Sequence, residues 1–63
     1  MNLILKGKII EMYGAQWKFA HSLGTHEHFI SEVVREKRSL PPEERKRWAE
    51  KLQDKEERLF PSR

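Results

Sequence analysis

Residues 16–35 read QWKFAHSLGTHEHFISEVVR, and this stretch decides the expected fold. Apolar residues recur at helical spacing up to Leu23, Gly24 follows, and a second apolar stripe begins a few residues later. Glycine directly after the last periodic residue is typical of a helix C-terminus, because it adopts a left-handed backbone at little steric cost. We therefore predict two short helices joined by a tight turn, with Ala20 where the two helices approach closely.

The second helix of this pair is predicted over about residues 26–35, with its start at Thr25 or His26. Thr25 is the better N-cap residue by chemistry, because its hydroxyl oxygen accepts a bond from the free N–H groups of a helix start. Glu27 then lies in the first turn, where negative charge suits the helix dipole. The apolar residues form a single stripe and leave the opposite side polar. They are Phe29, Ile30, Val33 and Val34.

A further helix is predicted on either side of this pair. Residues 3–13 have apolar side chains at helical spacing, namely Leu5, Ile9, Ile10, Met12 and Tyr13. Gly7 costs this helix about 1 kcal/mol relative to alanine, so we expect the first turn to be frayed or non-helical. Residues 42–52 begin within a Pro-Pro pair, which suits a helix start. The inward side chains expected there are Trp48, Ala49 and Leu52.

A chain of 63 residues has room for one domain, which we assign to residues 1–53. Residues 54–63 are expected to form a charged C-terminal tail or a helix extension. Leu59 and Phe60 are the apolar pair of this segment, and they either fold back on the body or meet a partner chain.

The composition excludes several classes of protein. Cysteine is absent, so neither a disulfide framework nor a thiolate metal site stabilises the fold. Hydrophobic and charged residues each make up 37% of the chain, as in a small water-facing domain, and the net charge of +3 favours polyanions weakly. No apolar run approaches the roughly 20 residues of a membrane span, and no export signal opens the chain, so the cytoplasm is the expected compartment.

The helix pair resembles the lambda-repressor-like Cro/C1-type (XRE) family of phage and bacterial regulators. The matching residues are Gln16, Phe19, Ala20, Leu23, Gly24, Ile30, Ser31, Val33, Arg35, Lys37, Arg38 and Ser39. The likeness extends over about residues 5–53. It implies an all-α bundle of four to five helices that contains a helix-turn-helix and binds double-stranded DNA in a sequence-specific way, as a transcriptional regulator. The second helix of the pair would then lie in the major groove.

The resemblance also implies roles for individual residues. Gln16 would bond a phosphate or a flanking base, unless it is an ordinary exposed residue at a helix start. Trp17 would stack against sugar and phosphate, although a place at the edge of the core is the favoured interpretation. Lys37 and Arg38 would clamp the DNA backbone. The residues implied to face the groove are His26, Glu27, His28, Ser31, Glu32 and Arg35.

Some residues depart from the family pattern. Thr25 stands where the family usually has an aliphatic residue, and Glu36 where it commonly has glycine. Glu27 and Glu32 repel phosphates, although a carboxylate can accept a bond from cytosine N4. The domain therefore either reads a cytosine-containing site or uses another partner. The alternative function is a protein-interaction module, antitoxin-like or anti-regulator, that uses these carboxylates and Phe29.

We expect neither catalysis nor a cofactor, since no nucleophile stands beside a plausible base and the chain is too small to enclose a reaction centre. His26 and His28 are two residues apart and point to different sides of a helix, so we expect no metal site. The expected partners are double-stranded DNA and a weakly bound second copy, which would pair in solution or only on DNA. A membrane and a small-molecule substrate are not expected.

Overall fold

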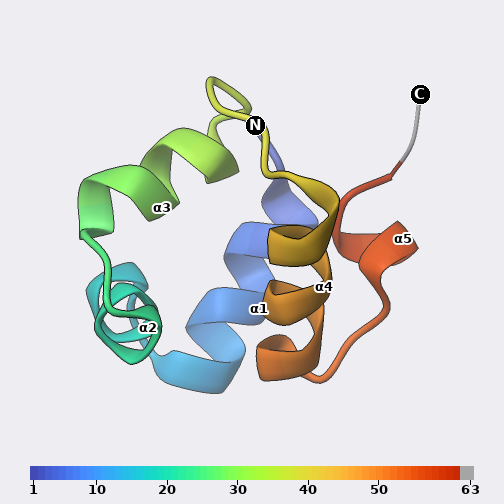
Figure 1. Ribbon diagram of the computed structural model, residues 1–63. Helices are drawn as coiled ribbons and strands as arrows, with labels where there is room; N and C mark the ends of the chain where they lie inside the picture. Colours follow the sequence, from blue (N-terminus) through green and yellow to red (C-terminus); the bar gives the residue numbers. More distant parts are fainter. Residues whose placement is uncertain (62–63) are drawn as a thin grey trace.

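The computed structural model describes residues 1–61, and this part of the chain forms five α-helices and no strand (Figure 1). The helices are α1 (Leu3–Tyr13), α2 (Gln16–Leu23), α3 (Glu27–Val34), α4 (Pro42–Leu52) and α5 (Glu56–Leu59). The expectation of a small all-helical fold is therefore confirmed. The fifth helix lies in the segment expected as a tail or helix extension, and Ser62 and Arg63 of that segment lie outside the described residues.

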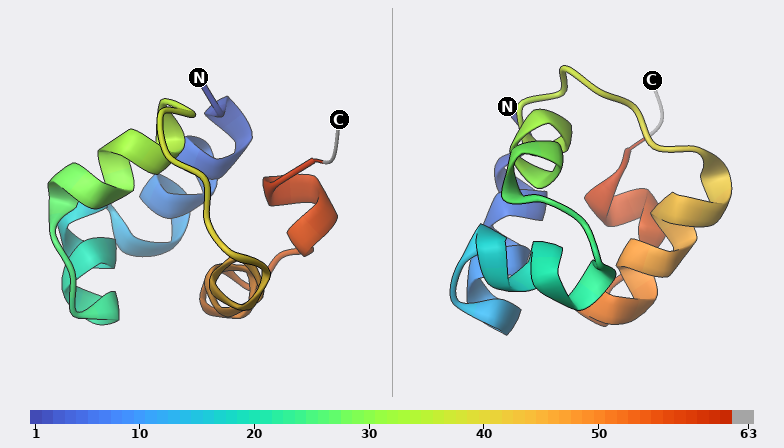
Figure 2. Two further views of the ribbon diagram at one scale, coloured as in Figure 1. Left: turned by 45° about the horizontal axis from the view of Figure 1, so that its top comes forward. Right: turned by 60° about the vertical axis from the view of Figure 1, so that its left-hand side comes forward.

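The first helix organises the bundle, because α1 contacts each of the other four helices. The α2–α3 pair lies on one side of α1, and α4 with α5 lies on the other (Figure 1). The most extensive contact between two helices is that of α2 with α3. In Figure 1 α2 is seen end-on while α3 runs across the view. In the right-hand view of Figure 2, α2 runs across the view and α3 is seen nearly end-on. The two helix axes therefore cross steeply.

The start of α1 is held by Asn2, which the sequence pattern does not single out. The Asn2 side chain accepts a bond from the N–H of Leu5 at 3.0 Å, as an N-cap does. The expectation that Gly7 frays the first turn is wrong, because the helix begins at Leu3. The cap and the packing of α1 against four helices outweigh the intrinsic cost of glycine.

The buried side of α1 includes only some of the apolar residues that recur at helical spacing. Leu5 and Ile9 are fully buried and Tyr13 is half-buried, whereas Ile10 and Met12 are exposed by 44% and 37%. Successive residues of a helix are about 100° apart, so a stripe centred on Ile9 leaves Ile10 on the outward side. Ile10 and Met12 thus belong to the apolar residues at helical spacing but lie beside the buried stripe.

The turn between α2 and α3 forms as the sequence predicts. Gly24 has φ +73°, the N–H of Gly24 donates to the His21 carbonyl at 3.1 Å, and the N–H of Thr25 donates to the Ala20 carbonyl at 3.0 Å. These two bonds are those of a Schellman motif, which satisfies the last carbonyls of a helix. Ala20 is buried, as expected for a residue at a close helix contact.

Two other helices end in the same way without glycine. After α3, Glu36 has φ +63°, and after α4, Gln53 has φ +54°. At each end the following amide donates five residues back, from Lys37 to the Glu32 carbonyl at 2.9 Å and from Asp54 to the Ala49 carbonyl at 3.1 Å. A left-handed backbone at a residue with a side chain costs roughly 1–2 kcal/mol, so the packing of the bundle imposes both turns.

The core is centred on Trp48 of α4, which is fully buried, as predicted. Its ring lies 5.1 Å from that of Phe19, 6.2 Å from that of Phe29 and 6.0 Å from that of Phe60, measured between centroids. The indole Nε1 has no hydrogen-bond partner among residues 1–61. Trp48 is therefore held by the rings around it. The buried core as a whole comprises Leu5, Ile9, Phe19, Ala20, Ile30, Val33, Val34, Leu40, Trp48, Ala49, Leu52 and Leu59.

The C-terminal segment folds back on the body, one of the two outcomes expected for Leu59 and Phe60. Leu59 is fully buried, and Phe60 packs against the core. The Asn2 side-chain amide donates to the Leu59 carbonyl at 2.6 Å, so the first and last described segments are joined directly. The helix α5 therefore shares the core of the preceding four.

Two glycines allow a matched test of backbone conformation. We expect Gly7→Ala to raise the free energy of unfolding by about 1 kcal/mol, because a Cβ there meets nothing within 4 Å and alanine is the better helix former. Gly24→Ala also meets nothing within 4 Å, but its φ of +73° predicts a loss of about 1 kcal/mol. Urea unfolding of both variants measures the two changes. A destabilising Gly7→Ala would contradict the open outward side of α1.

A pH-dependent contribution is expected from Asp54, which ties α5 to α1. The backbone N–H of Lys55 (2.7 Å) holds the pKa of Asp54 below its ordinary value of 3.8, against burial, and the nearby Arg58 and Lys8 add to the lowering. A lowered pKa contributes stability above 3.8 that is lost as pH falls through the lowered value. We expect Asp54→Asn to lower the Tm at pH 7 but to match the parent chain in acid. Thermal unfolding of both chains from pH 7 down to acid measures this. A difference in Tm that stays constant with pH would contradict the expectation.

Candidate functional site

The polar side of α3 is exposed over most of its length and partly covered at Ser31 and Glu32. Its exposed residues are His26, Glu27, His28 and Arg35, and its half-buried residues are Ser31 and Glu32. The opposite side buries Ile30, Val33 and Val34. In both Figure 1 and the left view of Figure 2, α3 forms an outer edge of the molecule. Five of the residues that the sequence assigned to a groove-facing surface therefore share one side of the helix by helical period, namely Glu27, His28, Ser31, Glu32 and Arg35, and His26 lies at the N-cap.

The helix α3 is one residue shorter at each end than predicted. His26 is the N-cap, with φ −102° and ψ 151°, and Arg35 is the C-cap. The preference for Thr25 as N-cap is wrong, because the helix begins one residue later and His26 occupies the N-cap position. Since no side chain caps α3, the first N–H groups of this helix keep their capacity to bond an acceptor.

The segment after α3 returns along the helix and places Arg38 beside it. The Nε of Arg38 donates to Glu32 Oε1 at 3.1 Å, and the guanidinium carbon lies 5.3 Å from the centroid of the Phe29 ring. The Nε2 of His28 lies 3.7 Å from the other Glu32 oxygen. One carboxylate of the polar side is therefore paired with a cation from the following segment.

This segment is anchored at the N-terminus of the chain. The N–H of Asn2 donates to the Val34 carbonyl at 2.7 Å, and the amino group of Met1 lies 2.9 Å from Glu36 Oε2. The backbone of Glu36 is left-handed, and its side chain points toward Met1. Lys37 and Arg38 follow directly and are exposed. The two predicted backbone-clamping cations therefore lie on a turn with defined geometry.

The N-terminus of α2 supplies the remaining predicted residues. Gln16 is half-buried at the first position of the helix, and no side chain caps this helix start. Trp17 is 56% exposed, and the Nζ of Lys18 lies 5.5 Å from the centroid of its ring. The favoured interpretation of Trp17 as a cover for the core edge is therefore wrong. Phe29 does pack against α4, through Trp48.

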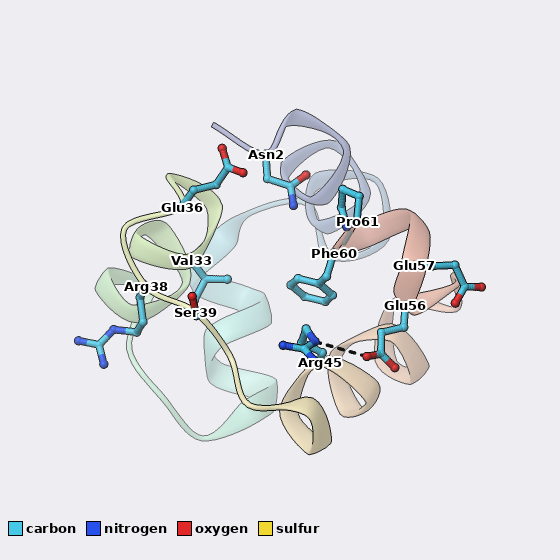
Figure 3. A pocket seen from close by; sticks show the side chains of 10 residues that line it. All are labelled: Asn2, Val33, Glu36, Arg38, Ser39, Arg45, Glu56, Glu57, Phe60 and Pro61. Carbon is cyan, nitrogen blue, oxygen red and sulfur yellow. Dashed lines mark hydrogen bonds and ion pairs between the residues drawn. The ribbon is translucent and has the colours of Figure 1, made fainter. Parts of the chain in front are cut away.

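A pocket opens where α3, the segment after it, α4 and α5 meet (Figure 3). The ring of Phe60 lies in it near Arg45, and the side chain of Arg38 points away from it (Figure 3). Arg45 donates to the Leu40 carbonyl at 2.8 Å and pairs with Glu56 at 3.4 Å. Two of the five N–H donors of Arg45 are therefore already bonded to groups of the chain itself.

Residues 1–61 hold neither a metal cluster nor a membrane span. No group of three or more His, Cys, Asp or Glu side chains is placed to hold a metal ion in this part of the chain. No helix there is long and apolar enough to cross a membrane.

Comparisons with protein-family profiles, with curated proteins and with solved structures each find no match for this chain. The function must therefore be inferred from the chemistry of the surface formed by α3, the segment after it and the start of α2. That surface combines two uncapped helix starts, at Gln16 and Glu27, with a polar helix side and the cations that follow it.

Proposed function

We propose that this chain binds double-stranded DNA in a sequence-specific way, as a transcriptional regulator in which α2 and α3 act as a helix-turn-helix. The observation that carries the proposal is the orientation of α3, whose apolar side is buried while its polar side, with Lys37 and Arg38 just beyond it, is accessible. Such a helix can enter the major groove only if its outward side is uncovered.

The dimensions of α3 suit this role. An α-helix with its side chains is about 10–12 Å across, and the major groove is about 12 Å wide, so the eight residues of α3 can lie in it. The steep crossing of α2 beneath α3 would let α2 brace the recognition helix while its own N-terminus approaches the DNA backbone.

Phosphate contacts are proposed at both ends of the surface. The uncapped N–H groups at the start of α2 and the side chain of Gln16 would bond one phosphate, because a helix N-terminus favours an anion. Trp17 and Lys18, both exposed, flank this point. Lys37 and Arg38 would bond the backbone at the other end.

Base contacts are proposed for the exposed residues of α3. Arg35 can donate two bonds to guanine, and Ser31 and His28 can contact either base of a pair. Glu27 has no ion pair among residues 1–61 and lies in the first turn, where recognition helices approach base edges. It is the carboxylate suited to accept from cytosine N4.

Membership of the lambda-repressor-like family is part of this proposal. It is supported by the residues that resemble that family and by the backbone of Glu36. This residue stands where the family commonly has glycine, and its φ of +63° is one that glycine adopts readily. The side chain thus departs from the family pattern while the backbone conformation agrees with it.

A second candidate function is protein binding, and the outward side of α1 favours it. Of the six large hydrophobic side chains that are exposed in the described chain, five lie between residues 1 and 12. Leu3, Ile4 and Ile10 are exposed by 68%, 49% and 44%, with Gly7 among them. This surface is much smaller than the roughly 20–30 residues a side of a standard interface, so a second copy of the chain would bind there weakly.

Titration with mixed-sequence duplex DNA at increasing salt tests the proposal. We expect affinity to fall steeply with salt. The double variant Lys37→Ala/Arg38→Ala should reduce the slope of log K against log salt by up to about 2, since each phosphate that is no longer neutralised accounts for about 0.9. Fluorescence anisotropy of labelled DNA measures both effects.

The matched control is Lys46→Ala/Arg47→Ala, which removes the same two charges from exposed positions on α4. It should change the slope much less. Equal effects of the two double variants, or binding that does not respond to salt, would contradict the proposed surface and favour protein binding.

A further inference from the structure

Two carboxylates lie on the polar side of α3, and their surroundings differ. Glu27 is exposed and has no ion pair among residues 1–61. Glu32 is only 28% exposed and accepts a bond from Arg38 at 3.1 Å. Removal of each carboxylate therefore removes the same charge from the same helix side, but only one removal releases an arginine.

Arg38 is held on two sides. Its Nε is bonded to Glu32, and its guanidinium lies over the ring of Phe29, which in turn packs edge-on against the buried Trp48. The backbone supports the same arrangement, because the N–H of Lys37 donates to the Glu32 carbonyl at 2.9 Å. The position of this exposed side chain is therefore set by the bond to Glu32 together with a ring that packs on the core.

We propose that Glu32 and Phe29 are positioning residues for Arg38, and that Glu32 does not read a base. This inference rests on the proposed DNA binding. The Nη nitrogens of Arg38 make no hydrogen bond within residues 1–61, and the side chain is 52% exposed. They are thus the donors that Arg38 presents to a DNA phosphate, while Nε stays on the carboxylate.

Two physical effects favour this role. A guanidinium that is already ordered loses less side-chain entropy on binding than a free one, so affinity rises without an additional contact. The carboxylate of Glu32 is also neutralised locally, which reduces its repulsion of the DNA backbone. A base-reading role would require Glu32 to give up or share a charge-assisted bond that it already makes.

The test compares Glu32→Ala with Glu27→Ala on mixed-sequence duplex DNA. Removal of a carboxylate from a DNA-facing surface should by itself strengthen non-specific binding, and we expect this for Glu27→Ala. For Glu32→Ala we expect the opposite sign, about fivefold weaker binding, with a salt slope reduced by about 0.9 because Arg38 no longer neutralises a phosphate. Glu32→Gln keeps an oxygen that can accept from Arg38 and should recover part of the affinity.

A double-mutant cycle isolates the pair. In an Arg38→Ala background, Glu32→Ala should no longer weaken binding, because the residue that it positions is gone. Phe29→Leu removes the aromatic face but keeps an apolar side chain against the core, and it should weaken binding in the presence of Arg38 only. Thermal unfolding of every variant separates these effects from loss of the fold.

The order of Arg38 is measured without DNA from the NMR signal of its Nε–H group. We expect this signal to be protected from solvent exchange in the parent chain and unprotected in Glu32→Ala. An unprotected parent signal would overturn the positioning role, as would stronger or unchanged non-specific binding of Glu32→Ala. If Glu32→Ala ceased to discriminate at one base position but kept its mixed-sequence affinity, Glu32 would read a base instead. The parent chain could also show a protected Nε–H signal but no salt-dependent DNA binding. That result would overturn the proposed function, and the bond between Arg38 and Glu32 would then be purely structural.

Discussion

The burial of Ile30, Val33 and Val34 determines how α3 is oriented, and the candidate surface depends on that orientation. If α3 turned by one residue, about 100°, in the direction that brings Glu32 toward the core, Ile30 and Val34 would be carried toward solvent. A buried, unpaired charge is strongly unfavourable. The helix is further held at its start by the turn through Gly24 and at its end by the bond from the N–H of Asn2 to the Val34 carbonyl. Its polar side therefore faces outward by necessity.

The core and the candidate surface meet at Phe29. Its ring forms a T-shaped pair with the buried Trp48, and the guanidinium of Arg38 lies over the same ring. A change in core packing around Trp48 would thus alter the position of the exposed Arg38, since only the Phe29 ring lies between them. In so small a domain few residues separate stability from recognition, and Phe29 contributes to both.

The sequence predicted features that depend on local chemistry and missed those that depend on tertiary contacts. The turn at Gly24, the limits of α4 and the inward position of Trp48 follow from residue type and helical period, and all three are found. Helical spacing did not separate the exposed Ile10 from the buried Ile9, because period alone does not locate the centre of a stripe. The bonds of Asn2, which reach α3 and α5, arise only once distant segments have packed, so no local pattern indicates them.

The candidate site divides in the same way. The sequence identified which polar residues share one side of α3, since helical period determines this directly. It treated Glu32 and Arg38 as independent contacts, because the return of the chain after α3 is not encoded in any periodicity. The two tryptophans offer a practical consequence of the fold. Trp48 is sealed among three aromatic rings, whereas Trp17 stands 56% exposed at the start of α2. The chain therefore carries two tryptophan fluorophores within 63 residues, one sensitive to the integrity of the interior and one open to quenchers from solvent.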